Sequence, residues 1–118
     1  MKLLTTEIRA KLIANGRLQE PLRGTRQEID FRPVVKLFNP SGAGTWLLTE
    51  IDPDDEDIAF GLCDLGMGCP EIGSVSLAEL ESVRGPFGLG IERDRYFEAD
   101  KTLSEYARAA SAAGHVQA

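Results

Sequence analysis

Residues that commonly carry enzyme chemistry are scarce in this 118-residue sequence, which contains one histidine, His115, and two cysteines, Cys63 and Cys69. Histidine is the side chain most often used as a general base, and a tetrahedral zinc site needs four ligands. His115 also lies in a C-terminal tail that we expect to fray from about residue 112. The sequence therefore argues against a histidine-based catalytic dyad or triad and against a structural zinc site.

Long apolar runs are missing as well. The first residues carry one lysine but lack the apolar stretch of about 7 to 15 residues that a signal peptide requires. No window approaches the ~20 apolar residues of a membrane helix. We therefore expect a cytoplasmic protein without membrane contact. Because thiols stay reduced in that compartment, we expect Cys63 and Cys69 to be unpaired.

Positive charge is in deficit, since 13 Lys and Arg residues stand against 19 Asp and Glu residues, for a formal charge of −6. A negative long-range field repels phosphate backbones, so direct binding to nucleic acid is not expected without a local basic patch. The best candidate for such a patch is Arg17, Arg23 and Arg26, in the segment 17–30. That segment has little periodicity and is predicted to be a mobile loop.

Hydrophobic patterning predicts a single domain over residues 1–118. Thr5 is predicted to cap a helix that ends at Asn15-Gly16. Runs rich in β-branched and aromatic residues predict five strands over residues 31–38, 45–51, 58–65, 72–76 and 89–97. Trp46, in the second run, is predicted to be a core residue.

Capping-box patterns predict the two remaining helices. Ser76 with Glu79 starts a short helix before the last strand, and Thr102 with Glu105 starts a C-terminal helix. The expected fold is α+β: an antiparallel β-meander of about five strands with an N-terminal helix, a short helix before the last strand and a C-terminal helix.

An acidic run between the second and third strands is the most distinctive charged feature. It comprises Asp52, Asp54, Asp55, Glu56 and Asp57. Pro53 suits a turn position, so residues 52–57 are predicted to be a projecting hairpin tip. Three interpretations are open: a solvated tip that also opposes aggregation, an acidic surface that docks a protein or mimics DNA, or a metal loop. The run lacks the central Gly of a calcium-binding loop, so no metal and no cofactor are predicted.

Two arginines, Arg93 and Arg95, interrupt the apolar face of the predicted fifth strand. In a structural interpretation their stems lie along the core edge and their guanidinium groups pair with carboxylates of a neighbouring strand. In a functional interpretation they contact a partner, with Arg84 nearby. We include Arg93 and Arg95 with the five acidic residues as candidate partner-binding residues, and we assign no catalytic residue.

Several segments together resemble domain-of-unknown-function family 2958. They are Met1 to Thr5, Val34 to Phe38, Thr45-Trp46, Asp57 to Gly61, Tyr96-Phe97 and, most specifically, the run Leu-Glu-Ser-Val-Arg-Gly-Pro-Phe-Gly-Leu-Gly-Ile-Glu-Arg-Asp that ends at Asp94. The resemblance extends from Met1 to about Tyr106. It implies a setting, because members are encoded largely on bacterial plasmids, integrative elements and phages, and no established activity comes with it.

The resemblance suggests a non-enzymatic accessory protein of a mobile genetic element. Its acidic surface would bind a host or element-encoded protein, in the manner of DNA mimics that inhibit CRISPR or restriction complexes. One alternative is a metal-dependent nuclease that uses Glu50, Asp52 and Asp64. Others are a protein that handles single-stranded nucleic acid and a homodimer that pairs uncovered sheet edges.

Overall fold

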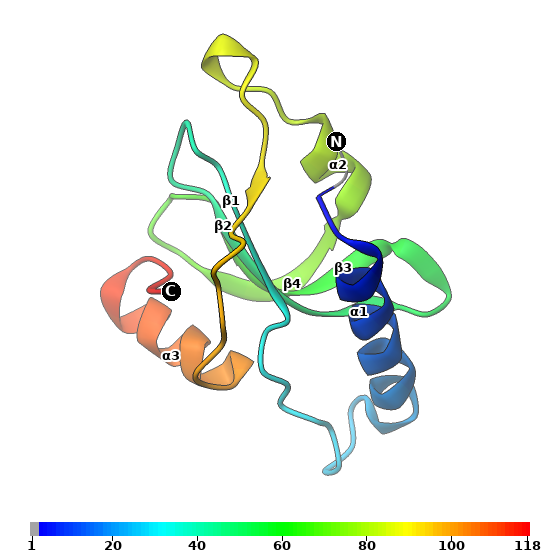
Figure 1. The fold of residues 1–118 in the computed structure, drawn as a ribbon. Coiled ribbons are helices and arrows are strands. Elements are labelled where there is room, and N and C mark those ends of the chain that lie inside the picture. Colours follow the sequence, from blue (N-terminus) through cyan, green and yellow to red (C-terminus); the bar gives the residue numbers. More distant parts are fainter. Residues whose placement is uncertain (1–2) are drawn as a thin grey trace.

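The computed structural model describes residues 3–118, and it confirms the α+β class and the five-stranded antiparallel sheet (Figure 1). Met1 and Lys2, at the start of the N-terminal motif, lie outside the described residues. The elements are α1 (Thr6–Gln19), η1 (Glu20–Leu22), β1 (Val35–Phe38), β2 (Thr45–Asp52), β3 (Asp55–Asp64), β4 (Glu71–Ser76), α2 (Leu77–Ser82), η2 (Pro86–Gly88), β5 (Glu92–Arg93) and α3 (Leu103–Ala113). The strand order is β4-β3-β2-β1-β5, so β4 and β5 form the two edges.

Helices cover both faces of the sheet, with α1 and α2 on one side and α3 on the other (Figure 1). The larger core joins α1 and α2 to the strands and includes Leu12, Leu37, Leu48 and Leu80. The smaller core, under α3, consists of Leu47, Leu62, Leu103, Tyr106 and Ala110. Strand β2 is buried on both faces, which explains its nearly unbroken apolar sequence. Trp46 is a core residue, as predicted.

Helix α1 starts as predicted but does not end at Asn15-Gly16. Thr5 Oγ accepts a hydrogen bond from the Ile8 amide at 3.1 Å, and the helix continues to Gln19 before the η1 turn. A Cβ on Gly16 would lie 1.9 Å from the Ile51 carbonyl oxygen, so Gly16 permits close contact with β2. The predicted stop was wrong because this glycine serves packing, and residues 17–22 of the predicted mobile loop are helical.

Strand β5 contains only Glu92 and Arg93, although the sequence pattern predicts a strand over 89–97. Its partner β1 is itself four residues long, and the pairing joins Arg93 to Leu37 and Glu92 to Phe38. The chain then turns, and the Tyr96 amide donates to the Asp94 carboxylate at 2.9 Å. The predicted alternation of faces therefore ends at Arg93.

The two predicted caps are present. Ser76 Oγ accepts from the Glu79 amide at 3.2 Å, and Thr102 with Glu105 forms a complete capping box. Helix α3 ends at Gly114, whose φ of 82° is readily adopted by glycine. None of the helices within residues 3–118 has the length and apolar character needed to span a bilayer.

The C-terminal tail returns to the sheet after α3. The Val116 amide donates to Asp64 Oδ2 at 3.0 Å, and Lys36 Nζ donates to the Ala118 carbonyl at 2.6 Å. The sequence pattern predicts fraying from about residue 112, whereas the structure holds the helix to Ala113 and gives the tail these contacts.

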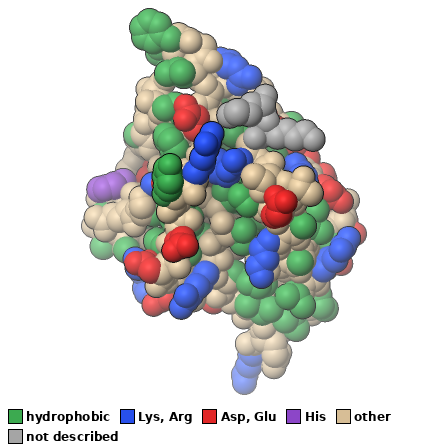
Figure 2. Space-filling model, in the orientation of Figure 1, with side chains coloured by type: hydrophobic (Ala, Val, Ile, Leu, Met, Phe, Trp, Pro, Cys, Tyr) green, Lys and Arg blue, Asp and Glu red, His purple; other side chains and the backbone are tan. Residues whose placement is uncertain are grey.

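A projecting segment lies between α2 and β5, with hydrophobic side chains at its tip (Figures 1 and 2). Phe87 is 98% exposed there, and its backbone φ of 64° is in the left-handed region that non-glycine residues rarely adopt. The segment is closed at its base by the Gly85 amide, which donates to the Leu89 carbonyl at 2.6 Å. Phe87 therefore contributes little to either core.

Candidate functional site: an acidic cleft at the end of the β2–β3 hairpin

The β2–β3 hairpin is tighter than the predicted acidic loop. Asp52 pairs directly with Asp55, which leaves Pro53 and Asp54 as the two turn residues. The Asp54 amide donates to Asp52 Oδ1 at 2.9 Å and stabilises the turn. The remaining acidic residues, 55–57, belong to β3, so the prediction of a six-residue tip over 52–57 was wrong.

Asp57 has a structural role. Its carboxylate accepts hydrogen bonds from Ser76 Oγ at 2.5 Å and from the Ala78 amide at 2.8 Å, at the start of α2. The hydrogen bond from Ser76 is the main cause that lowers the pKa of Asp57, and the one from Ala78 is the second, because both stabilise the charged form. Asp57 thus helps to cap α2, while Asp55 and Glu56 are exposed on the same strand.

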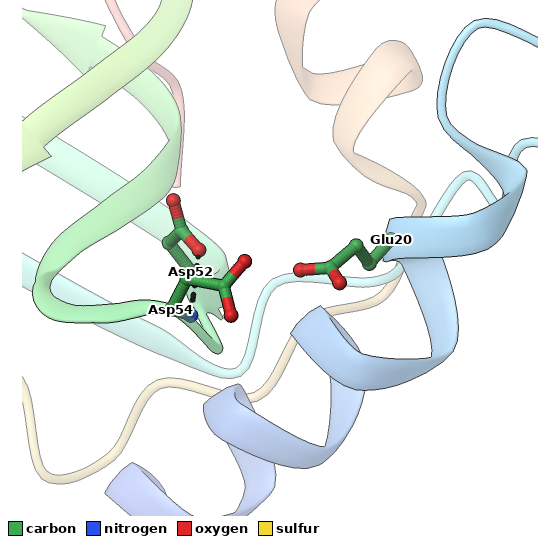
Figure 3. A group of neighbouring side chains, drawn as sticks. All are labelled: Glu20, Asp52 and Asp54. Carbon is green, nitrogen blue, oxygen red and sulfur yellow. Dashed lines mark hydrogen bonds between the residues drawn. The ribbon is translucent and has the colours of Figure 1, made fainter.

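Glu20, which the sequence analysis missed, joins two of the predicted residues. Its carboxylate lies with those of Asp52 and Asp54 in a group whose ligand atoms are all within 4.8 Å of one another (Figure 3). We call Glu20, Asp52 and Asp54 the acidic cluster. Repulsion by Asp54 is the main cause that raises the pKa of Glu20. Only the extension of α1 beyond Gly16 brings Glu20 here, and no local sequence signal indicated that extension.

The acidic cluster lines a cleft of about 420 Å³ that also contains Arg23, Glu50 and Phe60. Four carboxylates face one guanidinium group in this cleft, so its formal charge is strongly negative. No ion pair links the acidic cluster to a basic side chain within the described part of the chain. Elsewhere, on the face shown in Figure 2, acidic and basic side chains are interspersed. The acidic cluster is therefore a local concentration of negative charge that no ion pair among the described residues offsets.

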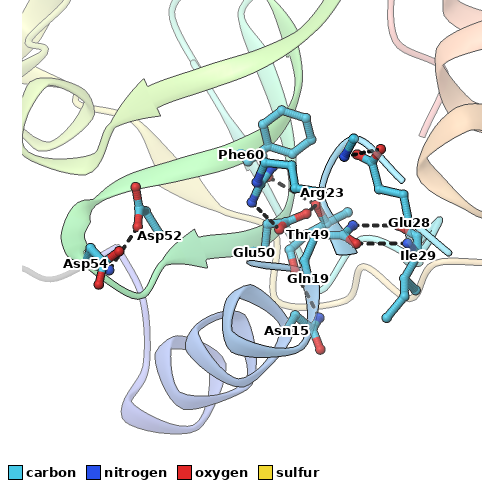
Figure 4. Close-up of polar contacts among 11 residues, drawn as sticks. Asn15, Gln19, Arg23, Glu28, Ile29, Thr49, Glu50, Asp52, Asp54 and Phe60 are labelled. Carbon is cyan, nitrogen blue, oxygen red and sulfur yellow. Dashed lines mark hydrogen bonds and ion pairs between the residues drawn. The ribbon is translucent and has the colours of Figure 1, made fainter. Parts of the chain in front are cut away.

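Glu50 lies at the inner wall of the cleft and is 2% exposed. A register shift in β2 between Leu48 and Glu50 puts Thr49 out of the regular pairing. Arg23 Nη2 lies 3.1 Å from Glu50 Oε2, and its guanidinium carbon is 5.7 Å from the centre of the Phe60 ring (Figure 4). Burial raises the pKa of Glu50, and Arg23 counteracts this by stabilising the carboxylate.

Two buried amide side chains of α1 hold the surrounding backbone (Figure 4). Asn15 Nδ2 donates to the Thr49 carbonyl at 2.9 Å, which fixes the helix against the shifted part of β2. Gln19 forms a pair of hydrogen bonds with the Ile29 backbone, at 2.7 and 2.9 Å. The two bonds between Gln19 and Ile29 join the ends of the segment 19–29, which carries Arg23. A second cavity of about 250 Å³ lies beside this segment and shares Glu50 and Phe60 with the cleft.

The predicted residues Arg93 and Arg95 lie away from the acidic cluster. Arg93 pairs with Leu37, whose β2 partner is Trp46, and Asp52 is six residues, or about 20 Å, further along β2. Arg93 Nη1 donates to the Leu3 carbonyl, and Arg95 is exposed. Neither arginine is ion-paired to a carboxylate within residues 3–118, so the predicted pairing with a neighbouring strand was wrong.

The three acidic residues considered for a nuclease are not brought together. Asp64 pairs with Thr45 at the far end of β2, whereas Glu50 and Asp52 lie near the hairpin. The two oxygens of Asp64 accept hydrogen bonds from the amides of Gly66 and Val116. Asp64 therefore holds the loop after β3 and the C-terminal tail.

We expect Glu50→Gln to change how stability depends on pH. The pKa of Glu50 is raised above its ordinary value of 4.5, so the folded state binds this proton more tightly than the unfolded chain. Its contribution to the free energy of unfolding is present below pH 4.5 and is lost as pH rises through the raised pKa. Urea unfolding from pH 4 to pH 8 should show the variant gaining stability relative to the wild type over that window. A difference that does not vary with pH would contradict the assignment.

Comparison with known protein families gives a match over nearly the whole chain. The model of the family described as Protein of unknown function (DUF2958) matches residues 3–117, so the chain belongs to that family. No curated protein and no solved structure matches it.

Proposed function

We propose that this protein is a non-enzymatic binding protein that holds a basic segment of a protein partner in the acidic cleft. The observation that carries the proposal is the acidic cluster, in which three carboxylates from η1 and the hairpin converge without an ion-paired basic partner among the described residues. The raised pKa of Glu20 reflects the repulsion that results. An incoming cation relieves this repulsion, so binding energy is available at the cluster.

The surroundings of the acidic cluster suit a macromolecular ligand. The cleft is open to solvent at its acidic rim, and the exposed Asp55 and Glu56 continue the negative charge along β3. Such a surface accelerates encounter with a basic partner and makes binding sensitive to salt. We propose no partner contact for Asp57, whose carboxylate caps α2. Arg93 and Arg95 would form a separate contact, if the partner reaches the β5 edge.

We further propose that the partner is a host protein or a protein encoded by a mobile genetic element. Inhibition of a complex that targets nucleic acid, such as a CRISPR or restriction complex, would be the biological consequence. The net charge of −6 supports this proposal, since a protein that competes with DNA for a basic groove must itself be acidic.

The test compares two variants that remove the same amount of charge. The cluster variant is Glu20→Gln/Asp52→Asn/Asp54→Asn, and the control is Glu7→Gln/Glu71→Gln/Glu79→Gln, at exposed positions outside both the cleft and the β5 edge. Partners are captured from bacterial lysate that carries phage or plasmid defence systems, identified by mass spectrometry and then measured with purified components. We expect the cluster variant to lose at least tenfold in affinity and the control to bind like the wild type.

Equal binding by the wild type and the cluster variant would contradict the proposal. Calorimetric titration with Mg²⁺, Mn²⁺ and Ca²⁺ separates the metal alternative. Tight binding of one ion at the acidic cluster, together with ion-dependent cleavage of nucleic acid and no protein partner, would favour an enzyme in place of a binding protein.

A further inference from the structure

Arg23 is an unusual partner for Glu50 because the two residues differ sharply in burial. The Glu50 side chain is 3% exposed and belongs to the central strand β2, whereas the Arg23 side chain is 45% exposed. Residues 23–28 are all exposed, and Gly24 follows with a φ of 79°. A rigid, buried carboxylate is thus neutralised by a side chain from an exposed turn.

The groups around the Arg23 guanidinium have the chemistry that recognises this cation. Glu50 supplies a carboxylate at 3.1 Å, and the Phe60 ring supplies an aromatic face at 5.7 Å (Figure 4). Guanidinium is planar and weakly hydrated, so it combines an ion pair with stacking better than an ammonium group does. Both Glu50 and Phe60 belong to the sheet, where they pair directly across β2 and β3.

Space for a second side chain is present beside Glu50 and Phe60. The 420 Å³ cleft and the 250 Å³ cavity each have Glu50 and Phe60 in their walls. The acidic cluster lies on the cleft side, where it attracts a cation towards Glu50. A basic side chain that enters through the cleft therefore reaches the carboxylate that Arg23 occupies.

We propose that Glu50 and Phe60 form a guanidinium-binding site in which Arg23 is a resident occupant, and that an arginine side chain of the partner replaces it. This inference rests on the proposed function, because it assumes that the partner is basic and enters the cleft. Arg23 keeps the buried carboxylate neutralised in the free protein. The displaced Arg23 moves into solvent, near the carboxylates of the acidic cluster. Because the occupant competes, the apparent affinity of the partner is lower than the affinity of the empty site.

The proposal is tested with small probes, before any partner is known. N-acetyl-arginine amide and N-acetyl-lysine amide are titrated by NMR and calorimetry into the wild type, Arg23→Ala and the matched control Arg26→Ala. Arg26 lies in the same exposed segment, and no ion pair to it is formed within the described residues. We expect Arg23→Ala to bind the arginine probe at least tenfold more tightly than the wild type does, and more tightly than the lysine probe. Arg26→Ala should behave like the wild type.

Two further measurements keep the test decisive. The double variant Arg23→Ala/Glu50→Gln should not show the tighter binding of the arginine probe that is expected of Arg23→Ala. If Arg23→Ala unfolds, Arg23→Met replaces it, because methionine retains an apolar stem over Phe60. In the wild type, a high concentration of the arginine probe should shift the Arg23 Nε resonance towards that of a free arginine. No gain in a folded variant, equal binding of the two probes, or an Nε resonance that stays unchanged at saturation would overturn the proposal.

Failure of this site is distinguishable from failure of the proposed function. Suppose that Arg23→Ala binds neither probe more tightly than the wild type does, while the acidic-cluster variant still loses affinity for the partner. The cleft then binds the partner without a guanidinium site. If the probes bind as expected but the acidic-cluster variant binds the partner as tightly as the wild type does, the guanidinium site exists but does not bind that partner.

Discussion

Gly16→Ala is expected to lower the free energy of unfolding by about 3 kcal/mol, which lowers Tm by roughly 10 °C. Helix propensity alone predicts the opposite, since alanine is better than glycine inside a helix by about 1 kcal/mol. A Cβ on Gly16 would lie 1.9 Å from the Ile51 carbonyl oxygen and 3.3 Å from Pro53 Cδ. The first neighbour is backbone of the central strand and cannot move aside without shifting β2.

Thermal and urea unfolding followed by circular dichroism measure this effect. Gly73→Ala is the matched control, because Gly73 lies in the edge strand β4 and a Cβ there meets nothing within 4 Å. The control is expected to stay within about 0.5 kcal/mol of the wild type. A Gly16→Ala variant as stable as the wild type would show that α1 does not approach β2 as closely as described. Because Glu20 directly follows α1, at the start of η1, the acidic cluster would then be in doubt as well.

Tyr106→Ala is expected to lower the free energy of unfolding by about 3 to 5 kcal/mol and to detach α3 from the sheet. Tyr106 is 3% exposed and is the largest member of the smaller core. Its ring centre lies 6.3 Å from that of Phe97, and its hydroxyl is 3.0 Å from Asp100 Oδ1. The other buried members of this core are three leucines and one alanine, with five partly buried residues packed against them, so Tyr106 is the largest buried side chain that holds α3 on the sheet.

Hydrogen exchange distinguishes local from global loss in this variant. We expect the amides of residues 103–113 to lose protection while those of α1 and β2 keep it, because α1 packs on the larger core. Tyr106→Phe is the control that keeps the ring and removes only the hydroxyl, and a loss of about 1 kcal/mol is expected. Uniform loss of protection across the whole chain would show instead that the two cores unfold as one unit.

Local sequence patterns identified most helix starts and strands, because the physics involved acts over a few residues. Thr5 and Ser76 cap their helices by accepting hydrogen bonds from amides three residues ahead, and the Thr102 amide donates to the Glu105 carboxylate of its capping box. The apolar run 45–51 forms the central strand, and Asp52 extends it by one residue. The same patterns failed for β5, since its length depends on the short partner β1 and not on its own alternation.

The candidate site was only half visible in the sequence. The acidic run indicated Asp52 and Asp54, but neither Glu20 nor the use of Asp57 as a cap could be read from it. Both depend on contacts between segments that are distant along the chain. The interaction of Arg23 with Glu50 spans 27 residues and arises because η1 continues α1 towards the hairpin.

By itself, the sequence determined the α+β class, the family, the helix caps and an acid-rich hairpin, all of which follow from composition and short-range patterns. The tertiary structure alone decided which charges meet. The close contact of Gly16 with Ile51 sets the path of α1, and that path brings Glu20 and Arg23 to the hairpin. Glu50 is buried in a strand that is covered on both faces, and a buried charge is costly unless it is paired. The ion pair with Arg23 is therefore important for the stability of the fold.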